Sequence, residues 1–401
     1  MDEKSFVPPP KWPRFGGTVV RFGISRFLVT IFATVSLLYV LKSHPQLAAN
    51  FGDKPLLGAS TAPSSIQIKP TTTPLLPWDK AEVLCAEHGM KPYPHRDKHR
   101  KVYDLFLVST ELDWTEIRLN ELAPHVDYFV ILEAEQTFTN LTKPKYFKKN
   151  WKHFSQFQSQ IIYHVLNDDA VKGAWSWARE KYQRNAMLTQ VFPSLLGEKA
   201  PNMGDVIIVS DVDEIPYPET VEKLRNCEFP ERTGLLSRFF LYSFQLHRTD
   251  FEWFHPQATY WQGEKTILPE SLRMEGQTYQ FPSAAWHCTS CFPTVAEMIT
   301  KVESFSHQEY DKPEFKDPDQ IVRRVREGID VFDRKEIPYE RVEKADLDAP
   351  KYLLQHSERF AYLLDRDPKD ANFVDYVPRG RKDEYDRSNV DEDQAPKIYN
   401  P

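Results

Sequence analysis

The stretch that decides the fold is DVIIVSDVDE, which runs from Asp205 to Glu214. Its first half is rich in β-branched residues and is typical of a buried strand. Two carboxylates, those of Asp211 and Asp213, follow one residue apart. Because side chains alternate along an extended chain, we expect both to point to the same side. The stretch therefore predicts a strand that ends in a pair of oxygen ligands.

Other segments of the chain have the same strand-like composition. They are Val102–Ser109, Tyr128–Leu132, Ile161–Val165 and Leu235–Tyr242. A helical pattern at Ala174–Phe192, with Glu180 and Arg184 spaced for an i,i+4 pair, precedes the strand at Val206–Val209. This alternation predicts an α/β fold with a mostly parallel central sheet. Ligands bind beyond the carboxyl ends of such strands, where the two aspartates are expected.

Two later helices have clear start and stop signals. Thr294-Val295-Ala296-Glu297 is a capping box that predicts the start of a helix. Asp317-Pro318 supplies a cap and a first-turn proline for the next helix, and Gly328 stands where its C-terminal cap belongs.

The aspartate pair predicts a site for a divalent cation. Carboxylate oxygens suit Mg²⁺ or Mn²⁺, and such sites leave room for substrate phosphates. We expect Asp213 to contact the ion directly, and Asp211 to contact it through water. His287 is a candidate third ligand because neutral imidazole suits Mn²⁺. The alternative for His287 is a core histidine packed beside Trp286. A bound cation at this place indicates chemistry on a nucleotide diphosphate.

Several short segments of the chain follow the pattern of a known family. They are Glu133 with Thr137-Phe138-Thr139 and Lys143-Pro144, Gln183-Arg184-Asn185, Ser210–Pro216, Trp286-His287-Cys288, Cys291-Phe292, Lys301–His307 and Gly328–Phe332. In type and order they resemble glycosyltransferase family 17, and the resemblance runs from about Val102 to Phe332.

This resemblance implies a fold, a reaction and a place in the cell. The fold would be a GT-A-like nucleotide-sugar-binding domain, with Mn²⁺ (or Mg²⁺) as cofactor and UDP-GlcNAc as donor. The family's best-known members are the β-1,4-mannosyl-glycoprotein β-1,4-N-acetylglucosaminyltransferases that add bisecting GlcNAc. The resemblance therefore implies inverting transfer of GlcNAc to a mannose-containing glycan, on N-glycoproteins, at the Golgi membrane. The partners would be a nucleotide-sugar donor and a glycan or glycoprotein acceptor.

Four residues are candidates for binding the nucleotide. Arg179 and Arg184 could reach the diphosphate, because a guanidinium fork matches phosphate oxygens. An ordinary pair with Glu180 is the alternative for Arg184. Glu133 ends the second strand and could bind the nucleotide or cap a turn. Asp211 could hold the ribose.

An inverting transfer also needs a general base. Candidates lie in the polar, aromatic-rich region between the aspartate pair and His287: Asp250, Glu252, Glu264 and Glu270. We predict Asp250 as the base and keep Glu270 as the second catalytic candidate. The aromatic residues of the region could stack on sugar rings or belong to the core. They are Trp253, Tyr260 and Trp261.

The N-terminal residues predict where the protein works. Phe22–Leu41 is apolar and long enough to span a bilayer. Basic residues before it predict a cytosolic tail, residues 1–21, by the positive-inside rule. A cleaved signal peptide is the alternative, but no small-x-small cleavage site follows directly. A Pro-, Ser- and Thr-rich stem (42–101), a catalytic domain (102–365) and a polar, disordered tail (366–401) would follow the membrane anchor.

The four cysteines and the net charge add further limits. Cys85, Cys227, Cys288 and Cys291 allow three disulfide pairings in an oxidising lumen. The C-x-x-C at 288–291 could be half of a zinc site or a redox pair, but without a second such motif a structural role is favoured.

The net charge of −7 disfavours nucleic acid as a partner. Asn140-Leu141-Thr142 is a glycosylation sequon, useful only in an exposed, lumenal loop.

Two other functions remain open from the residues alone. A haloacid-dehalogenase-like phosphatase also places D-x-D after an apolar strand. However, Glu214 stands where that class would have a small hydroxyl residue. A non-catalytic carbohydrate-binding protein would use the aromatic residues, but it does not require the aspartate pair.

Overall fold

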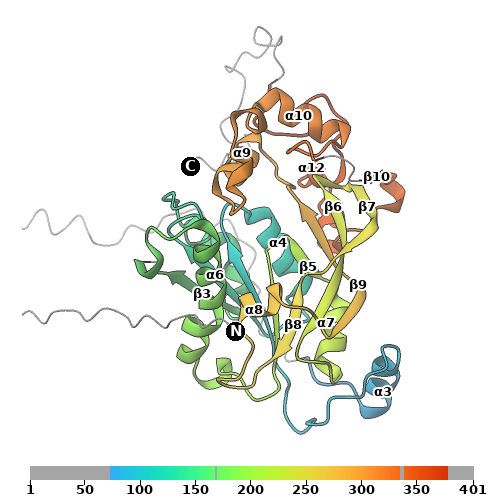
Figure 1. Cartoon of the computed structure of the whole chain (residues 1–401). Coiled ribbons are helices and arrows are strands. Elements are labelled where there is room, and N and C mark those ends of the chain that lie inside the picture. Colours follow the sequence, from blue (N-terminus) through green and yellow to red (C-terminus); the bar gives the residue numbers. More distant parts are fainter. Residues whose placement is uncertain (1–72, 168, 335–337, 378–401) are drawn as a thin grey trace, which may run out of the picture. The chain divides into compact units, whose positions relative to one another are not determined.

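The computed structural model describes residues 73–167, 169–334 and 338–377 (Figure 1). Its centre is a group of parallel strands, which in spatial order are β4 (Val206–Ser210), β1 (Val102–Val108), β2 (Tyr128–Ala134) and β3 (Ile161–Leu166). Every residue of β2 and β4 is buried, as expected for strands covered on both faces. The strands predicted here are confirmed to within two residues at their ends.

The remaining strands form a mixed extension of the same sheet. They are β5 (Glu214–Pro216), β6 (Thr233–Leu241), β7 (Ser243–Trp253), β8 (Gln257–Tyr260), β9 (Tyr279–Thr289) and β10 (Glu340–Arg341). β8 joins the two halves by pairing antiparallel with both β4 and β6. β7 pairs antiparallel with β6, whereas β9 lies parallel to it. The predicted α/β class is confirmed, and the parallel arrangement is strict in the half that carries the aspartate pair.

Helices cover both faces of the parallel strands. One face packs on α4 (Leu112–Leu122), α5 (Tyr146–Lys149), α7 (Pro218–Asn226), α11 (Lys351–Gln355) and α12 (Ala361–Leu364). The other face packs on α6 (Ser176–Ala186), on the π-helical turn Met187–Val191 that continues it, and on α8 (Pro269–Met274). Alternate strand residues separate the two cores: Val102 and Phe106 of β1 face one, and Tyr103 and Leu105 face the other.

The two later helices begin and end as predicted, and they form a third apolar cluster with β6 and β7. In α9 (Val295–Ser304) the Thr294 hydroxyl accepts the backbone N–H of Glu297. In α10 (Pro318–Glu327) Asp317 caps the first turn, and Gly328 ends the helix with a left-handed φ of 67°. A Cβ on Gly328 would also lie 3.2 Å from Leu246, so glycine suits this site for two reasons.

The packed domain is longer at both ends than the predicted 102–365. It includes α3 (Trp78–Ala86), which the sequence analysis assigned to the stem. It also includes residues beyond Asp365 that were predicted to be disordered. Arg366 is fully buried and donates to the carbonyls of Tyr242, Phe292 and Ala371. Asp375 accepts the first free N–H groups of α9. The segment was predicted to be disordered because its composition is polar, but composition does not reveal such specific polar contacts.

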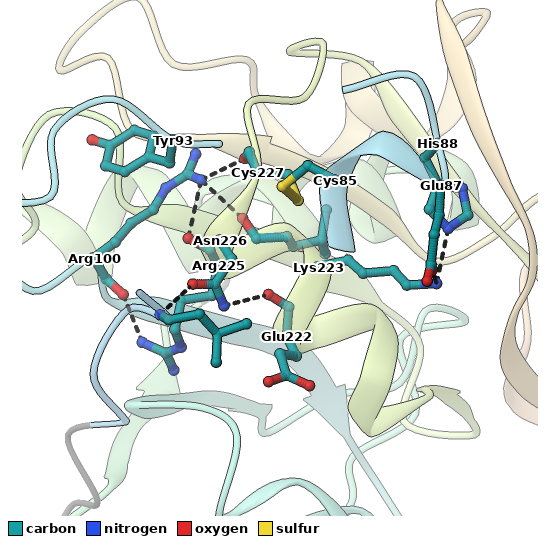
Figure 2. Close-up of a disulfide and its surroundings, with 12 residues drawn as sticks. Cys85, Glu87, His88, Tyr93, Arg100, Glu222, Lys223, Arg225, Asn226 and Cys227 are labelled. Carbon is teal, nitrogen blue, oxygen red and sulfur yellow. Dashed lines mark hydrogen bonds and ion pairs between the residues drawn. A yellow bond between two sulfur atoms is a disulfide. The ribbon is translucent and has the colours of Figure 1, made fainter. Parts of the chain in front are cut away.

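Two disulfides are present, Cys85–Cys227 and Cys288–Cys291. The first ties α3 to the end of α7, and Figure 2 shows the polar contacts around it. Arg100 donates to the carbonyl of Cys227, and Arg225 donates to the carbonyl of Arg100. Arg100 also donates to the carbonyl of Leu224, and Arg225 to the carboxylate of Asp127. Because α7 directly follows β5, these contacts also fix the segment that leaves the aspartate pair. The second disulfide joins both cysteines of the C-x-x-C motif, so neither is a zinc ligand in this structure.

The predicted cytosolic tail and membrane anchor, residues 1–41, lie outside the described residues, as does most of the predicted stem. Among the helices of the described part of the chain, none is long and apolar enough to cross a bilayer.

Candidate active site

A cavity of about 550 Å³ lies at the carboxyl ends of the parallel strands. It is lined by residues 107–111 at the end of β1, by Gln136–Phe138 after β2 and by Asp211–Asp213 after β4. Residues 253–255, the end of α8, and α9 with the residues that follow it also line the cavity. The aspartate pair is therefore at the edge of the sheet where the sequence predicted a ligand site.

A larger hollow, of about 740 Å³, lies between α4, α7 and α11. It contains neither aspartate of the pair, and its main carboxylate, Asp348, is bonded to Trp286, Tyr217 and Arg238. We therefore place the chemistry in the smaller cavity, where the strand ends meet.

The two aspartates occupy a tight turn rather than the strand itself. β4 ends at Ser210, and β5 begins at Glu214. Glu214 holds the turn: its buried carboxylate accepts the backbone N–H of Asp211 at 2.8 Å and the indole N–H of Trp253 at 2.9 Å. Arg273 of α8 donates to both of its oxygens, at 2.7 and 3.0 Å. Burial opposes ionisation of Glu214, but Arg273 outweighs it and holds its pKa well below the usual value.

A second buried arginine supports the turn from beneath. Arg118 of α4 pairs with Asp104 of β1 at 2.6 and 2.7 Å. It also donates to the Ser210 hydroxyl at 2.5 Å and to the Glu214 carbonyl at 2.7 Å. Since none of these side chains is exposed, the turn rests on a rigid base.

Asp211 and Asp213 differ sharply in their surroundings. The Asp211 side chain is 44% exposed and lies 3.1 Å from Arg273 and 3.5 Å from Arg184. Burial raises its pKa, but the two arginines prevail and the pKa lies below the usual value. Asp213 is only 18% exposed and pairs with no arginine or lysine within the described residues. Burial, and then the nearby carboxylates Asp211 and Glu214, raise the pKa of Asp213 to about 7, against the opposing effect of Lys301.

His287 faces the turn without completing a metal site. Its Nε2 lies 3.9 Å from the Asp213 carboxylate, and its ring packs edge-on against Phe239. Burial lowers the pKa of His287 to about 4, so the ring is neutral. Its Nδ1 is buried without a hydrogen-bond partner in the described structure. His287 is thus a buried histidine, as in the alternative kept for it, but its ring packs on Phe239, whereas Trp286 lies against Tyr217.

The donor set fits a hard cation only in part. Across the described residues, no group of three or more His, Cys, Asp and Glu side chains is arranged to hold a metal. The predicted trio of Asp211, Asp213 and His287 is therefore not a preformed site. Asp213, however, is a carboxylate with an uncompensated charge, and Asp211 is open to the cavity. Two oxygen ligands of this kind, with the remaining positions left to water and phosphate, suit Mg²⁺ or Mn²⁺.

Two predicted nucleotide ligands have structural roles instead. Glu133 is fully buried and accepts the N–H groups of Phe147 and Lys148 and the hydroxyl of Tyr163. It caps α5, which was the alternative kept for it. Arg179 is also fully buried, and it donates to the side chains of Gln136 and Asn140. Arg179 therefore holds the loop that lines the cavity, and it engages the exposed sequon residue Asn140.

Arg184 lines the cavity and has three carboxylate partners, among them Glu180, the pair kept as its alternative. It donates to Glu180 and Glu270 at 2.6 Å each, and it reaches Asp211 at 3.5 Å. Glu270 does not line the cavity and is engaged by this arginine, so its position contradicts the prediction of a catalytic carboxylate.

The position of Asp250 also contradicts its prediction as the general base. Its side chain is 48% exposed, pairs with Arg248 and does not line the cavity. The reason is a break in the sheet: Arg238 of β6 is opposite Glu252, but the next residue, Phe239, is opposite Arg248. Residues 249–251 therefore bulge out of the ladder, and Asp250 lies in the bulge.

The comparison with known proteins identifies the family. The sequence matches glycosyltransferase family 17 over residues 24–369. The chain belongs to glycosyltransferase family 17. The predicted resemblance is thus confirmed.

Curated relatives of this family 17 chain carry one name. This chain is 27% identical over 310 residues to the β-1,4-mannosyl-glycoprotein 4-β-N-acetylglucosaminyltransferase of Homo sapiens. The match covers 67% of this chain and 56% of that protein. The chain is 26% identical over 317 residues to the enzyme of the same name from Rattus norvegicus, covering 68% and 57%. The chain thus spans little more than half the length of the curated relatives it matches.

One solved structure is a distant neighbour. It is a mannosyltransferase from Pyrobaculum calidifontis in complex with GDP-mannose and Mn²⁺, at 9% identity and a TM-score of 0.30. The match covers 74% of this chain and 80% of that one. At this TM-score the likeness carries no argument about the site.

Several cavity residues of this family 17 chain had no predicted role. They are Glu111, Arg273 and Lys301, with Glu180 known only as a partner of Arg184. Lys301 begins one of the segments that resemble the family, so a signal for it existed. Glu111 and Arg273 had none, because only the fold brings the β1–α4 loop and α8 to the aspartates. Of the aromatic candidates, Trp253 lines the cavity, whereas Tyr260 and Trp261 pack on Phe229 and Phe192.

Proposed function

We propose that this chain is a metal-dependent, inverting glycosyltransferase on a GT-A-like fold. It moves GlcNAc from UDP-GlcNAc to a mannose-containing glycan on N-glycoproteins, as in the addition of bisecting GlcNAc. The observation that carries the proposal is the turn with Asp211 and Asp213, which lines the cavity at the carboxyl end of β4 in a family 17 chain. The name of the curated relatives supports the choice of GlcNAc and mannose.

Asp213 and Asp211 would hold the divalent cation, Mn²⁺ or Mg²⁺. Asp213 is the stronger candidate for direct contact, because no arginine or lysine in the described structure neutralises it, whereas Asp211 already lies against Arg273. When bound, the cation supplies positive charge to the departing diphosphate. The remaining chemistry falls to the side chains of the cavity.

In the transfer step an acceptor hydroxyl attacks the anomeric carbon of the donor sugar. The bond from that carbon to the diphosphate oxygen breaks, UDP leaves with the electron pair, and the hydroxyl proton passes to a base. We assign the base to Glu111. Among the cavity carboxylates, Asp211 and Glu180 are engaged by arginines. In the part of the chain that the structure describes, the Glu111 carboxylate accepts only the N–H of Ser109, through one oxygen, so the other remains for a proton.

We also propose a Golgi address, with residues 22–41 as a single membrane anchor and the catalytic domain in the lumen. The proposal rests on the apolar length of that segment and on the basic residues before it. In sealed microsomes a C-terminal tag on the full chain should resist protease until detergent is added. Digestion of the tag without detergent would contradict this orientation.

The central test is a transfer assay with the full chain in detergent, Mn²⁺, a panel of UDP-sugars and mannose-containing acceptors. We expect transfer of GlcNAc that EDTA abolishes, with a β-1,4 linkage in the product. Asp213→Asn should reduce the rate by about a thousandfold, because it removes the main cation ligand without changing the size of the side chain.

The matched control is Asp346→Asn, since Asp346 is exposed and does not line the cavity. It should leave the rate unchanged. Release of phosphate without sugar transfer would favour a phosphatase instead. Sugar binding that survives Asp213→Asn, with no turnover of any donor, would favour a carbohydrate-binding protein.

A further inference from the structure

Lys301 is the cavity residue whose position neither the sequence nor the proposed function explains. It lies on α9, is half-buried and lines the same cavity as the aspartate turn. Within the described residues its ammonium group has no hydrogen-bond or ion-pair partner. A lysine that lines a cavity without such a partner is available to a ligand.

The charges around Lys301 come from three separate elements. The carboxylates that act on it most strongly are Asp213 and Asp211 of the turn, Glu111 of the β1–α4 loop and Glu180 of α6. None of them is within ion-pair distance, so the ammonium group lies among them without being bound to one.

The arginines of the cavity differ from Lys301 in this respect. Arg273 donates to both oxygens of Glu214, and Arg184 is shared by Glu180 and Glu270. The charge of each of these guanidinium groups is already compensated by carboxylates, so it offers an incoming phosphate less attraction than an ammonium group without an ion pair. Lys301 can reach a ligand without breaking any such pair.

We propose that Lys301 binds the diphosphate of the nucleotide donor, beside the cation held by the two aspartates. This inference rests on the proposed function. A diphosphate brings more negative charge than one divalent cation neutralises, and a flexible ammonium group is a common second partner for phosphate oxygens. Before the donor arrives, the same ammonium repels the cation, because both positive charges face Asp213.

The proposal therefore predicts two effects of opposite sign for Lys301→Met. The affinity for UDP should fall by about 10- to 100-fold, the usual range for one charged hydrogen bond. The affinity of the nucleotide-free protein for Mn²⁺ should rise by about fivefold, because a repelling charge is removed. A lysine that only packs against its neighbours would produce neither effect.

Calorimetric titration of the full chain in detergent tests this directly. UDP, UMP and uridine are titrated in saturating Mn²⁺, and Mn²⁺ is titrated alone. We expect Lys301→Met to lower the affinity for UDP strongly, to lower the affinity for UMP less, and to leave the affinity for uridine unchanged. Lys301→Arg, which keeps the charge, should remain within about fivefold of the original protein for UDP.

The matched control is Lys316→Met. Lys316 is a nearby lysine that pairs with Glu303 and Asp311 and does not line the cavity. It should change neither affinity.

The outcomes separate this inference from the proposed function. If the unaltered protein binds no UDP in the presence of Mn²⁺, the proposed donor is wrong. If it binds UDP and Lys301→Met binds it equally well, the donor stands and the role of Lys301 is wrong. If Lys301→Arg loses as much affinity as Lys301→Met, the positive charge is not what the ligand recognises, and the inference is also overturned.

Discussion

Two sets of charged residues along the cavity differ in how their charges are balanced. The first set, here called the arginine wall, consists of Arg184 and Arg273, which are neutralised by ion pairs with Glu180, Glu214 and Glu270 at 2.6–3.0 Å. The lysine wall, formed by Lys301, Asp213 and Glu111, has no ion pair among its members. Asp211 lies between the walls and is bonded to the arginine side. The first wall therefore holds the site in shape, and the second has charges left for a cation, a phosphate and a proton.

Glu111→Gln should have the largest effect on kcat among the substitutions that test this difference between the two sets of charges. If the lysine wall supplies the base, this substitution should lower kcat by about a thousandfold, equivalent to about 4 kcal/mol, with little change in the KM for the donor. The glutamine oxygen can still accept the Ser109 N–H, so the loop should keep its shape.

Glu180→Gln is the matched change on the arginine wall. It should lower kcat far less than Glu111→Gln, since Glu180 is engaged by Arg184 and the Ser306 hydroxyl. If Glu180→Gln lowered kcat a thousandfold and Glu111→Gln did not, the base would belong to the arginine wall.

The next largest effect concerns folding rather than turnover. Glu214→Gln should destabilise the protein by about 3 kcal/mol, because it leaves Arg273 buried without its charged partner. Denaturant unfolding of the purified chain measures this difference. Glu270→Gln, which removes a partner of Arg184 but leaves Glu180 in place, should cost clearly less. Equal losses from the two substitutions would mean that Glu214 is not the support of the turn.

Local sequence patterns predicted the elements of this fold and the place of the aspartate pair. β4 and the N-terminal caps of α9 and α10 depend on residues that are close together in the sequence. These elements could therefore be predicted from the sequence alone. The cavity at the end of β4 followed from the alternation of strands and helices.

The roles of individual side chains depended on contacts that the chain does not reveal locally. Glu133 looked like a strand-end ligand, but its partners, Phe147 and Tyr163, come from later elements. Asp250 looked like a base in an acceptor region, but a bulge in β7 turns it to the surface. Lys301 lay in a segment that resembled the family. Its proposed role in binding phosphate follows only from the fold, which places it in the same cavity as the aspartate pair.

The smallest expected effect distinguishes the two aspartates by pH. For Asp213 the pKa is raised from 3.8 to about 7 in the folded, metal-free protein. Between these values the folded state keeps a proton that the unfolded state has released. The stability from this group is therefore complete below about pH 4 and is lost as the pH rises through 7. Urea unfolding in EDTA should show the original protein losing about 2 kcal/mol relative to Asp213→Asn between pH 5 and pH 8.

The same measurement on Asp211→Asn should have the opposite sign. Because Arg273 and Arg184 hold the pKa of Asp211 below its usual value, its contribution is present above about pH 4 and is lost only as the pH falls further. Glu297 also titrates abnormally, but it is common to all three proteins, so its effect cancels in the differences between variants. Mn²⁺ should remove the pH dependence contributed by Asp213, because a bound cation replaces the proton. If Asp213→Asn and Asp211→Asn gave the same profile, the arginine and lysine walls would not differ in charge balance, and the assignment of Asp213 as the main cation ligand would lose its electrostatic basis.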